Sequence, residues 1–214
     1  MAKVAQECGK NEECISFMRE IIYKEHKLSY HERNLLNAAY KGIIGPLRNA
    51  LTLLQDESNE YDVKSETMEI SQSLIQKCDE AVALFRDQLL PYAKEPEIRI
   101  FYGKIIADFL RYKWEGTTGR EQEEVAEECK DAYDQVVELT KTSLPVYHPL
   151  RLELFLNFSV FTYEVLGDPV EARNLAISAR SDAESGLDQL SNESKEEAIH
   201  AMELLRENIA QWEQ

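Results

Sequence analysis

Apolar residues recur every three to four positions along nearly the whole chain, which is the spacing of amphipathic helices. Residues 29–54 show the pattern well, and no segment alternates apolar and polar residues with a period of two. The pattern predicts nine helices joined by short turns, over residues 1–8, 11–22, 29–54, 63–90, 97–115, 120–141, 149–166, 169–186 and 192–212. The predicted fold class is therefore all-α, with antiparallel helices in a single domain spanning residues 1–214.

Local sequence signals set the expected helix ends. Asn11, Asp168 and Ser191 are residue types that cap helix N-termini, and each stands before an apolar repeat. Pro46 lies inside the third repeat, where the missing N–H predicts a kink or local defect. Residues 56–62 are polar and predict a turn.

The stretch HPLRLELFLNFSVFTYEVL, residues 148–166, is apolar on most sides, which is typical of a central helix. Pro149 suits the first helical position because proline lacks the N–H that would be unpaired there. Asn157, Val160 and Glu164 fall on one face of this helix. A polar stripe of this kind either lines a groove or joins a buried hydrogen-bond network, and the pattern alone leaves both interpretations open.

Composition narrows the classes of partner. The chain has 24 Lys and Arg against 40 Asp and Glu, which gives a net charge of −16. Such a charge argues against nucleic acid and against an anionic membrane surface as partners. No apolar run approaches the roughly 20 residues that span a bilayer. The first 20 residues show no secretory signal, and the cysteines are scattered at Cys8, Cys14, Cys78 and Cys129, so a reducing, cytoplasmic setting is expected.

The chain carries no catalytic or metal-binding pattern. Glycine-rich phosphate loops and zinc-ligand spacings are absent. The histidines, at His26, His31, His148 and His200, belong to no recognised motif and are interpreted as surface or capping residues. We therefore expect neither an enzyme nor a cofactor, and no metal.

The scarce basic residues are more informative. Cations spaced seven apart occur on two predicted helices, with a tyrosine after the last: Lys41 and Arg48, then Lys104, Arg111 and Tyr112. Arginine offers a planar fork to phosphate, and lysine and tyrosine add a charge and a hydroxyl donor, so these residues suggest a positive pocket. The alternative is an i,i+4 ion pair between Lys104 and Asp108 within one helix.

Four segments together resemble the 14-3-3 family, in the same order and with similar separations along nearly the whole chain. They are RNLLNAAYKGIIGPLR (33–48), FYGKIIADFLRY (101–112), HPLRLELFLNFSVFTYEVLGDPVEARNLA (148–176) and LLRENIAQW (204–212). The resemblance implies a nine-helix adaptor that binds phosphoserine or phosphothreonine peptides in a concave groove. It also implies a cup-shaped domain that pairs as a homodimer.

The matched motifs imply roles for particular residues. The phosphate would be bound by Lys41, Arg48, Arg111 and Tyr112. The peptide would be held by the amides of Asn157 and Asn208, by Lys104 on the groove floor, by the polar pair Glu164 and Trp212, and by an apolar wall of Leu156, Val160 and Leu204.

The sequence departs from the family pattern at several positions. His200 and Ala201 stand where larger apolar groove residues are usual, and Ile106 stands where a second groove lysine is usual. The first helix offers few apolar contacts before Gly9, so we expect a weaker dimer than is usual for the family. A TPR-like helical-repeat module that binds unphosphorylated peptides is the alternative to a phosphopeptide adaptor.

Overall fold

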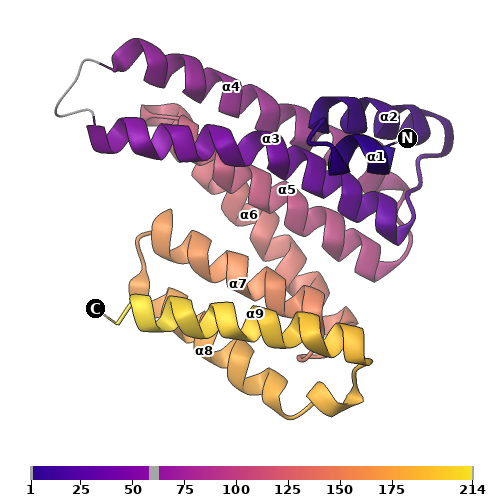
Figure 1. Cartoon of the computed structure of the whole chain (residues 1–214). Coiled ribbons are helices and arrows are strands. Elements are labelled where there is room, and N and C mark those ends of the chain that lie inside the picture. Colours follow the sequence, from indigo (N-terminus) through magenta and orange to yellow (C-terminus); the bar gives the residue numbers. More distant parts are fainter. Residues whose placement is uncertain (1, 58–62, 214) are drawn as a thin grey trace. The chain divides into compact units, whose positions relative to one another are not determined.

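The computed structural model describes residues 2–57 and 63–213, and within these ranges it contains nine α-helices and no strand (Figure 1). The all-α prediction is therefore confirmed. The helices are α1 Ala2–Glu7, α2 Asn11–Glu25, α3 Tyr30–Glu57, α4 Lys64–Ala83, α5 Pro96–Gly116, α6 Gly119–Ser143, α7 Pro149–Glu164, α8 Pro169–Glu184 and α9 Asn192–Gln211.

The predicted helix ends are partly correct. The Asp168 carboxylate accepts a hydrogen bond from the Glu171 N–H at 2.9 Å, and the Ser191 hydroxyl accepts one from the Ser194 N–H at 3.3 Å, so both caps are confirmed. The predicted Asn11 cap is wrong, because Lys10 takes the cap position without a side-chain bond and Asn11 is the first helical residue. Helix α3 continues through Pro46 as far as Glu57, while the rest of the predicted turn, residues 58–62, lies outside the described residues.

The fourth predicted helix changes character before it ends. After α4, a π-helical segment, η1 (Leu84–Leu89), is followed by a 3₁₀ turn, η2 (Leu90–Tyr92), which contains Pro91. A π turn is wider than an α turn by one residue, so it rotates the side chains that follow it. Leu84, Phe85 and Leu89 remain buried through this change.

The chain divides into two compact units, which we describe separately. The first comprises Met1–Lys94 and Ile105–Cys129, and the second comprises Glu95–Lys104 and Lys130–Gln214. Helices α5 and α6 contribute residues to both units. The single domain predicted from the sequence stays a prediction.

An aromatic cluster forms the core of the first unit, where α3 and α4 run side by side (Figure 1). Tyr40 and Phe85 are fully buried, and their rings lie 5.9 Å and 6.3 Å from the ring of Phe109. Phe109 in turn meets the ring of Tyr112 edge-on at 5.9 Å. Aromatic pairs at these separations add stabilisation beyond the area they bury. The cluster thereby fixes the faces of α3 and α5 on which the predicted phosphate ligands lie.

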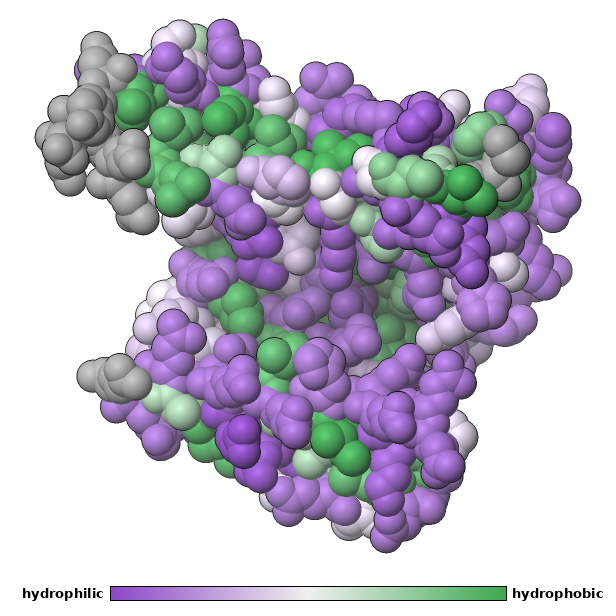
Figure 2. Space-filling model, viewed as in Figure 1, coloured by the Kyte–Doolittle hydropathy of each residue, from purple (hydrophilic) through white to green (hydrophobic). Residues whose placement is uncertain are grey.

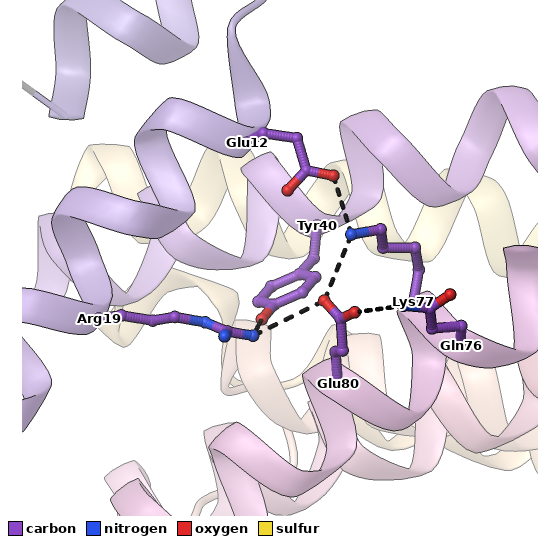
Figure 3. A network of polar contacts seen from close by, with 6 residues as sticks. All are labelled: Glu12, Arg19, Tyr40, Gln76, Lys77 and Glu80. Atoms are coloured by element: carbon purple, nitrogen blue, oxygen red, sulfur yellow. Dashed lines mark hydrogen bonds and ion pairs between the residues drawn. The ribbon is translucent and has the colours of Figure 1, made fainter.

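A polar network ties α2 to α3 and α4 beside this core (Figure 3). Lys77 bonds Glu12 at 2.9 Å and Glu80 at 3.3 Å. Arg19 lies 3.7 Å from Glu80 and donates to the buried Tyr40 hydroxyl at 3.2 Å. Burial raises the pKa of Tyr40, so the phenol stays neutral and accepts this bond. The network therefore anchors the α3 residue that directly precedes Lys41.

Small residues let helices approach closely in the second unit. Leu152 of α7 packs in a buried cluster with alanines of α8 and α9: Ala176, Ala183, Ala198 and Ala201. A side chain at Gly103 of α5 would overlap Val136 of α6, so these helices meet where the glycine lies. Alanine and glycine at these contacts keep the backbones near each other and fix the positions of α5, α7 and α9.

The visible surface is mainly hydrophilic, with hydrophobic side chains gathered over the C-terminal end of α3 and the N-terminal end of α4 (Figure 2). Leu53 and Met68 belong to these ends and are 62% and 58% exposed. In the described part of the chain, none of the helices combines the length and apolar character that a bilayer-crossing segment needs.

Candidate functional site

The first unit holds two of the predicted cations in one cluster. Arg48 of α3 donates two hydrogen bonds to the Glu115 carboxylate of α5, from Nε to Oε2 at 2.6 Å and from a terminal nitrogen to Oε1 at 2.7 Å. Arg111, one turn before Glu115, lies 3.8 Å from Oε1 of the same carboxylate. Glu115 therefore bridges two guanidinium groups that would otherwise repel each other.

Tyr112 lies against both guanidinium groups. The central carbon of Arg48 is 4.1 Å from the centre of the ring, and that of Arg111 is 4.8 Å away. Cations within about 6 Å of an aromatic centre are attracted by the ring. Tyr112 and Arg111 are buried, at 8% and 7% exposure, so both arginines are held in defined positions before any ligand binds.

Lys41 shares a face of α3 with Arg48, two turns away, and its side chain is exposed. Its neighbour Tyr40 is fixed in the core, which sets the rotation of α3 at this point. Two guanidinium groups, an ammonium group and a phenol on adjoining faces are suited to a tetrahedral anion, because each offers N–H or O–H donors.

Lys104 belongs to the second unit, although it was grouped with these cations in the sequence. Its ammonium group lies 3.4 Å from the Glu153 carboxylate of α7, and only 6% of its side chain is exposed. A buried lysine must be paired to remain charged, and Glu153 supplies a partner.

The second unit presents Asn157 and Val160 on α7 as half-buried side chains, with Glu164 exposed at its end. Their orientation follows from an aromatic contact on α7, where Tyr133 packs 5.5 Å from Phe158 and 5.2 Å from Phe161. Glu164 is thus open to solvent while Asn157 is half-buried, and both interpretations of this stripe stay predictions.

Helix α9 packs against α7 and α8, and it presents Leu204 and Asn208, both half-buried. Near its end, the Trp212 ring stacks on Tyr163 at 4.9 Å, and Tyr163 is the neighbour of Glu164. Ala201 lies in the core and His200 is exposed. Leu156 packs against the same core cluster as Trp212. The predicted peptide-binding residues of α7 and α9 thus occur on helices that are packed together.

His148 caps α7, which is one of the two roles expected for the histidines. Its Nδ1 accepts a hydrogen bond from the Leu150 N–H at 3.3 Å, so the imidazole must be neutral there. Burial lowers the pKa of His148, while the nearby carboxylates of Glu97, Glu197 and Glu153 oppose that shift. Protonation of Nδ1 of His148 would therefore remove the hydrogen bond that caps the N-terminus of α7.

The sequence pattern did not identify Glu115, which makes the shortest contact in the cluster of Arg48, Arg111 and Tyr112. Its position four residues after Arg111 was the available signal, but i,i+4 pairs are common and the fork to Arg48 joins residues 67 apart. Two cavities in the first unit, of about 730 and 560 Å³, are lined by residues outside the cluster of Arg48, Arg111 and Tyr112. Arg19 and Tyr23 line the larger of the two, and Met68 and Gly116 line the smaller.

Three of the four cysteines, Cys14, Cys78 and Cys129, are buried, while Cys8 is exposed. Burial raises the pKa values of the Cys78 and Cys129 thiols, so neither is a ready nucleophile. Among residues 2–57 and 63–213, no group of three or more His, Cys, Asp or Glu side chains is placed to hold a metal ion.

Comparison with known proteins gives one consistent result. The family model described as 14-3-3 protein matches residues 1–213. A 14-3-3 protein homolog from Trichoderma harzianum is 36% identical, covering 99% of this chain and 85% of that protein. The 14-3-3-like protein GF14-E of rice, Oryza sativa subsp. japonica, is 37% identical, and the human 14-3-3 protein beta/alpha is 33% identical, with 99% of this chain covered in both and 86% and 89% of those proteins.

The His148 cap predicts a pH-dependent stability. Its pKa is lower in the folded chain than the roughly 6.5 of an unfolded histidine, so the unfolded state binds the proton first. The stabilisation by the neutral cap is complete above about pH 6.5 and is lost as the pH falls through the folded pKa. His148→Asn keeps a capping acceptor without a titrating ring, so the variant should lose less free energy of unfolding between about pH 7.5 and 5.5 than the wild type.

Urea denaturation at each pH measures this difference. His31→Asn, at an exposed position of α3, controls for the loss of one imidazole. If wild type and His148→Asn lost stability in parallel, protonation of the cap would play no part.

Proposed function

The chain belongs to the 14-3-3 family, and we propose that it is an adaptor that binds phosphoserine or phosphothreonine segments of client proteins. The observation that carries the proposal is the pair of guanidinium groups, Arg48 and Arg111, held on one tyrosine ring, with the exposed Lys41 two turns before Arg48 on the same face of α3. Phosphate recognition by arginine clusters is a mode of which 14-3-3 proteins are themselves an example.

The chemistry of the first unit suits a phosphorylated residue. Such a residue carries about −1.5 to −2 charges at neutral pH and several strong acceptor oxygens. Arg48, Arg111 and Lys41 supply charge-assisted donors, and the Tyr112 hydroxyl adds another. Since these groups are positioned by the core, binding requires little reorganisation.

The second unit would hold the peptide main chain. Asn157 and Asn208 each have an amide group that can donate to a carbonyl and accept from an N–H. Leu156, Val160 and Leu204 would supply the apolar wall, while Lys104, Glu164 and Trp212 would contact polar parts of the ligand. Because the main chain is common to all peptides, the adaptor would accept many clients that share only the phosphorylated residue.

The adaptor makes and breaks no bond in this proposal, and it requires no cofactor. We place it in the cytoplasm, where the scattered cysteines would stay reduced. The net charge of −16 disfavours nucleic acid and anionic membranes as partners. A module that bound unphosphorylated peptides would lack the phosphate dependence tested next.

Charge reversal in the phosphate cluster should abolish tight binding. Lys41→Glu or Arg111→Glu should weaken the binding of a phosphoserine peptide by at least about 1.5–3 kcal/mol, the contribution of a hydrogen bond to a charged group. Fluorescence anisotropy with the peptide and its unphosphorylated twin measures the effect. Arg120→Glu makes the same charge change on a side chain of α6 that is 90% exposed, and it should retain binding. Unchanged affinity in either cluster variant would show that the phosphate binds elsewhere.

Loss of the Asn208 amide should weaken all phosphorylated ligands alike. Asn208→Ala should cost about 0.5–1.5 kcal/mol, one neutral hydrogen bond, for phosphopeptides of unrelated sequence. Asn174→Ala, on an exposed position of α8, is the matched control. A loss confined to one peptide would mean that Asn208 reads a side chain.

We also propose that the chain forms a homodimer through α1 and the surface of α3, and that this dimer is weak. Ala5 of α1 is buried within its own unit, which leaves Val4, at 58% exposure, and the exposed Cys8 as apolar contacts. Leu51 of α3 adds nothing to this interface, because it is only 2% exposed and belongs to the core. Each fully buried apolar side chain contributes roughly 1.5–3 kcal/mol to association. Because the interface offers so few of them, we expect a dimer dissociation constant in roughly the micromolar range.

Analytical ultracentrifugation from nanomolar to tens of micromolar protein tests this proposal. The sedimentation coefficient should rise with concentration across the range. Val4→Lys should move the transition to higher concentration, whereas Val170→Lys, at a 70% exposed valine of α8, should not. A dimer at every concentration, or a monomer at every concentration, would contradict a weak interface.

A further inference from the structure

The anion-binding arginine of the first unit already holds a carboxylate. Glu115 takes the Nε edge of Arg48 in a two-bond fork at 2.6 and 2.7 Å. This geometry uses one edge of the guanidinium and leaves the N–H groups of its outer edge directed elsewhere. The fork is partly shielded from water, since the Arg48 and Glu115 side chains are 30% and 21% exposed.

Glu115 is held at this place by its own helix. It follows Tyr112 and Arg111 by one turn on α5, and these two residues are buried. Lys113 of the same helix does not compete for it, because Lys113 pairs with Asp79 of α4 at 2.7 Å. The carboxylate is therefore always near Arg48, at an effective concentration that a free ligand does not match.

A ligand carboxylate gains little by replacing such a group. If it took the fork, one carboxylate would be exchanged for another, and Glu115 would be left partly buried without its strongest partner. If it took only the outer edge of Arg48, its single charge would be opposed by Glu115 nearby. A phosphate differs because it carries up to two charges and three terminal oxygens, so it can engage Arg48, Arg111 and Lys41 together while Glu115 stays in place.

We propose that Glu115 is a specificity-determining residue, which makes the site select phosphate and reject carboxylates. The inference rests on the proposed phosphopeptide binding, and it leads us to expect that acidic segments, including Asp or Glu in place of the phosphorylated residue, bind weakly. Glu115 would thus contribute to the discrimination between phosphate and carboxylate by competing for Arg48, in addition to the contribution of the cations themselves.

The test compares three peptides of one sequence, with phosphoserine, glutamate or unmodified serine at the central position. Their dissociation constants are measured for wild type and for Glu115→Gln, which keeps the side-chain shape and removes the charge. The ratio of the glutamate-peptide to the phosphopeptide dissociation constant should fall about tenfold or more in the variant, mainly because the glutamate peptide binds more tightly. Glu115→Asp, which keeps the charge on a shorter side chain, should give an intermediate ratio.

Glu124→Gln removes the same charge from an exposed site of α6, where Glu124 pairs with Arg120 in its own helix, and should leave the ratio at the wild-type value. If Glu115→Gln weakened both peptides equally, Glu115 would only support the arginines and the inference would be wrong. If Glu115→Gln failed to fold, an unchanged ratio in Glu115→Asp would overturn it equally. If the wild-type protein binds the phosphopeptide tightly, the proposed function stands whatever the variants do. If the wild-type protein binds none of the three peptides, both the proposed function and this inference are overturned.

Discussion

Two guanidinium groups of the same charge lie on one tyrosine ring because a carboxylate bridges them. Arg48 and Arg111 approach the Tyr112 ring at 4.1 and 4.8 Å, and Glu115 contacts both. Without that anion, the two partly buried like charges would repel each other at this point. Because Glu115 carries one negative charge against the two positive charges of the arginines, the three groups together remain positive. A site that binds an anion needs such a positive charge.

The bridge depends on a scaffold with little freedom. The rings of Tyr40, Phe85 and Phe109 fill the space between α3, η1 and α5, and the Arg19 bond to the Tyr40 hydroxyl fixes α3 from the side of α2. A close-packed core of this kind transmits a displacement of any member to its neighbours. Arg111 and Tyr112 are consequently held in place by the protein itself, so the proposed ligand would have few side chains of this cluster to order.

The second unit achieves the same rigidity by different means. Its core is built from small residues, with alanines of α8 and α9 around Leu152 and a glycine of α5 against Val136. Small side chains leave few rotamers to order and allow the helices to approach closely. The amides of α7 and α9 therefore stand on rigid elements, which suits main-chain recognition better than mobile loops would.

The sequence by itself determined the nine helices found in residues 2–57 and 63–213, the caps at Asp168 and Ser191, and the residue types of the candidate site, because helical periodicity and capping depend on neighbours a few positions apart. It did not determine the π turn at η1, the burial of Leu51 and Ala201, or the role of Glu115. Those depend on what packs against each residue, and the Arg48–Glu115 fork joins residues 67 apart. Only the tertiary structure decided which of several acidic residues would lie beside the arginines. A carboxylate four positions along a helix pairs in many sequences, whereas a contact with a second helix requires the core to bring the two side chains within hydrogen-bonding distance.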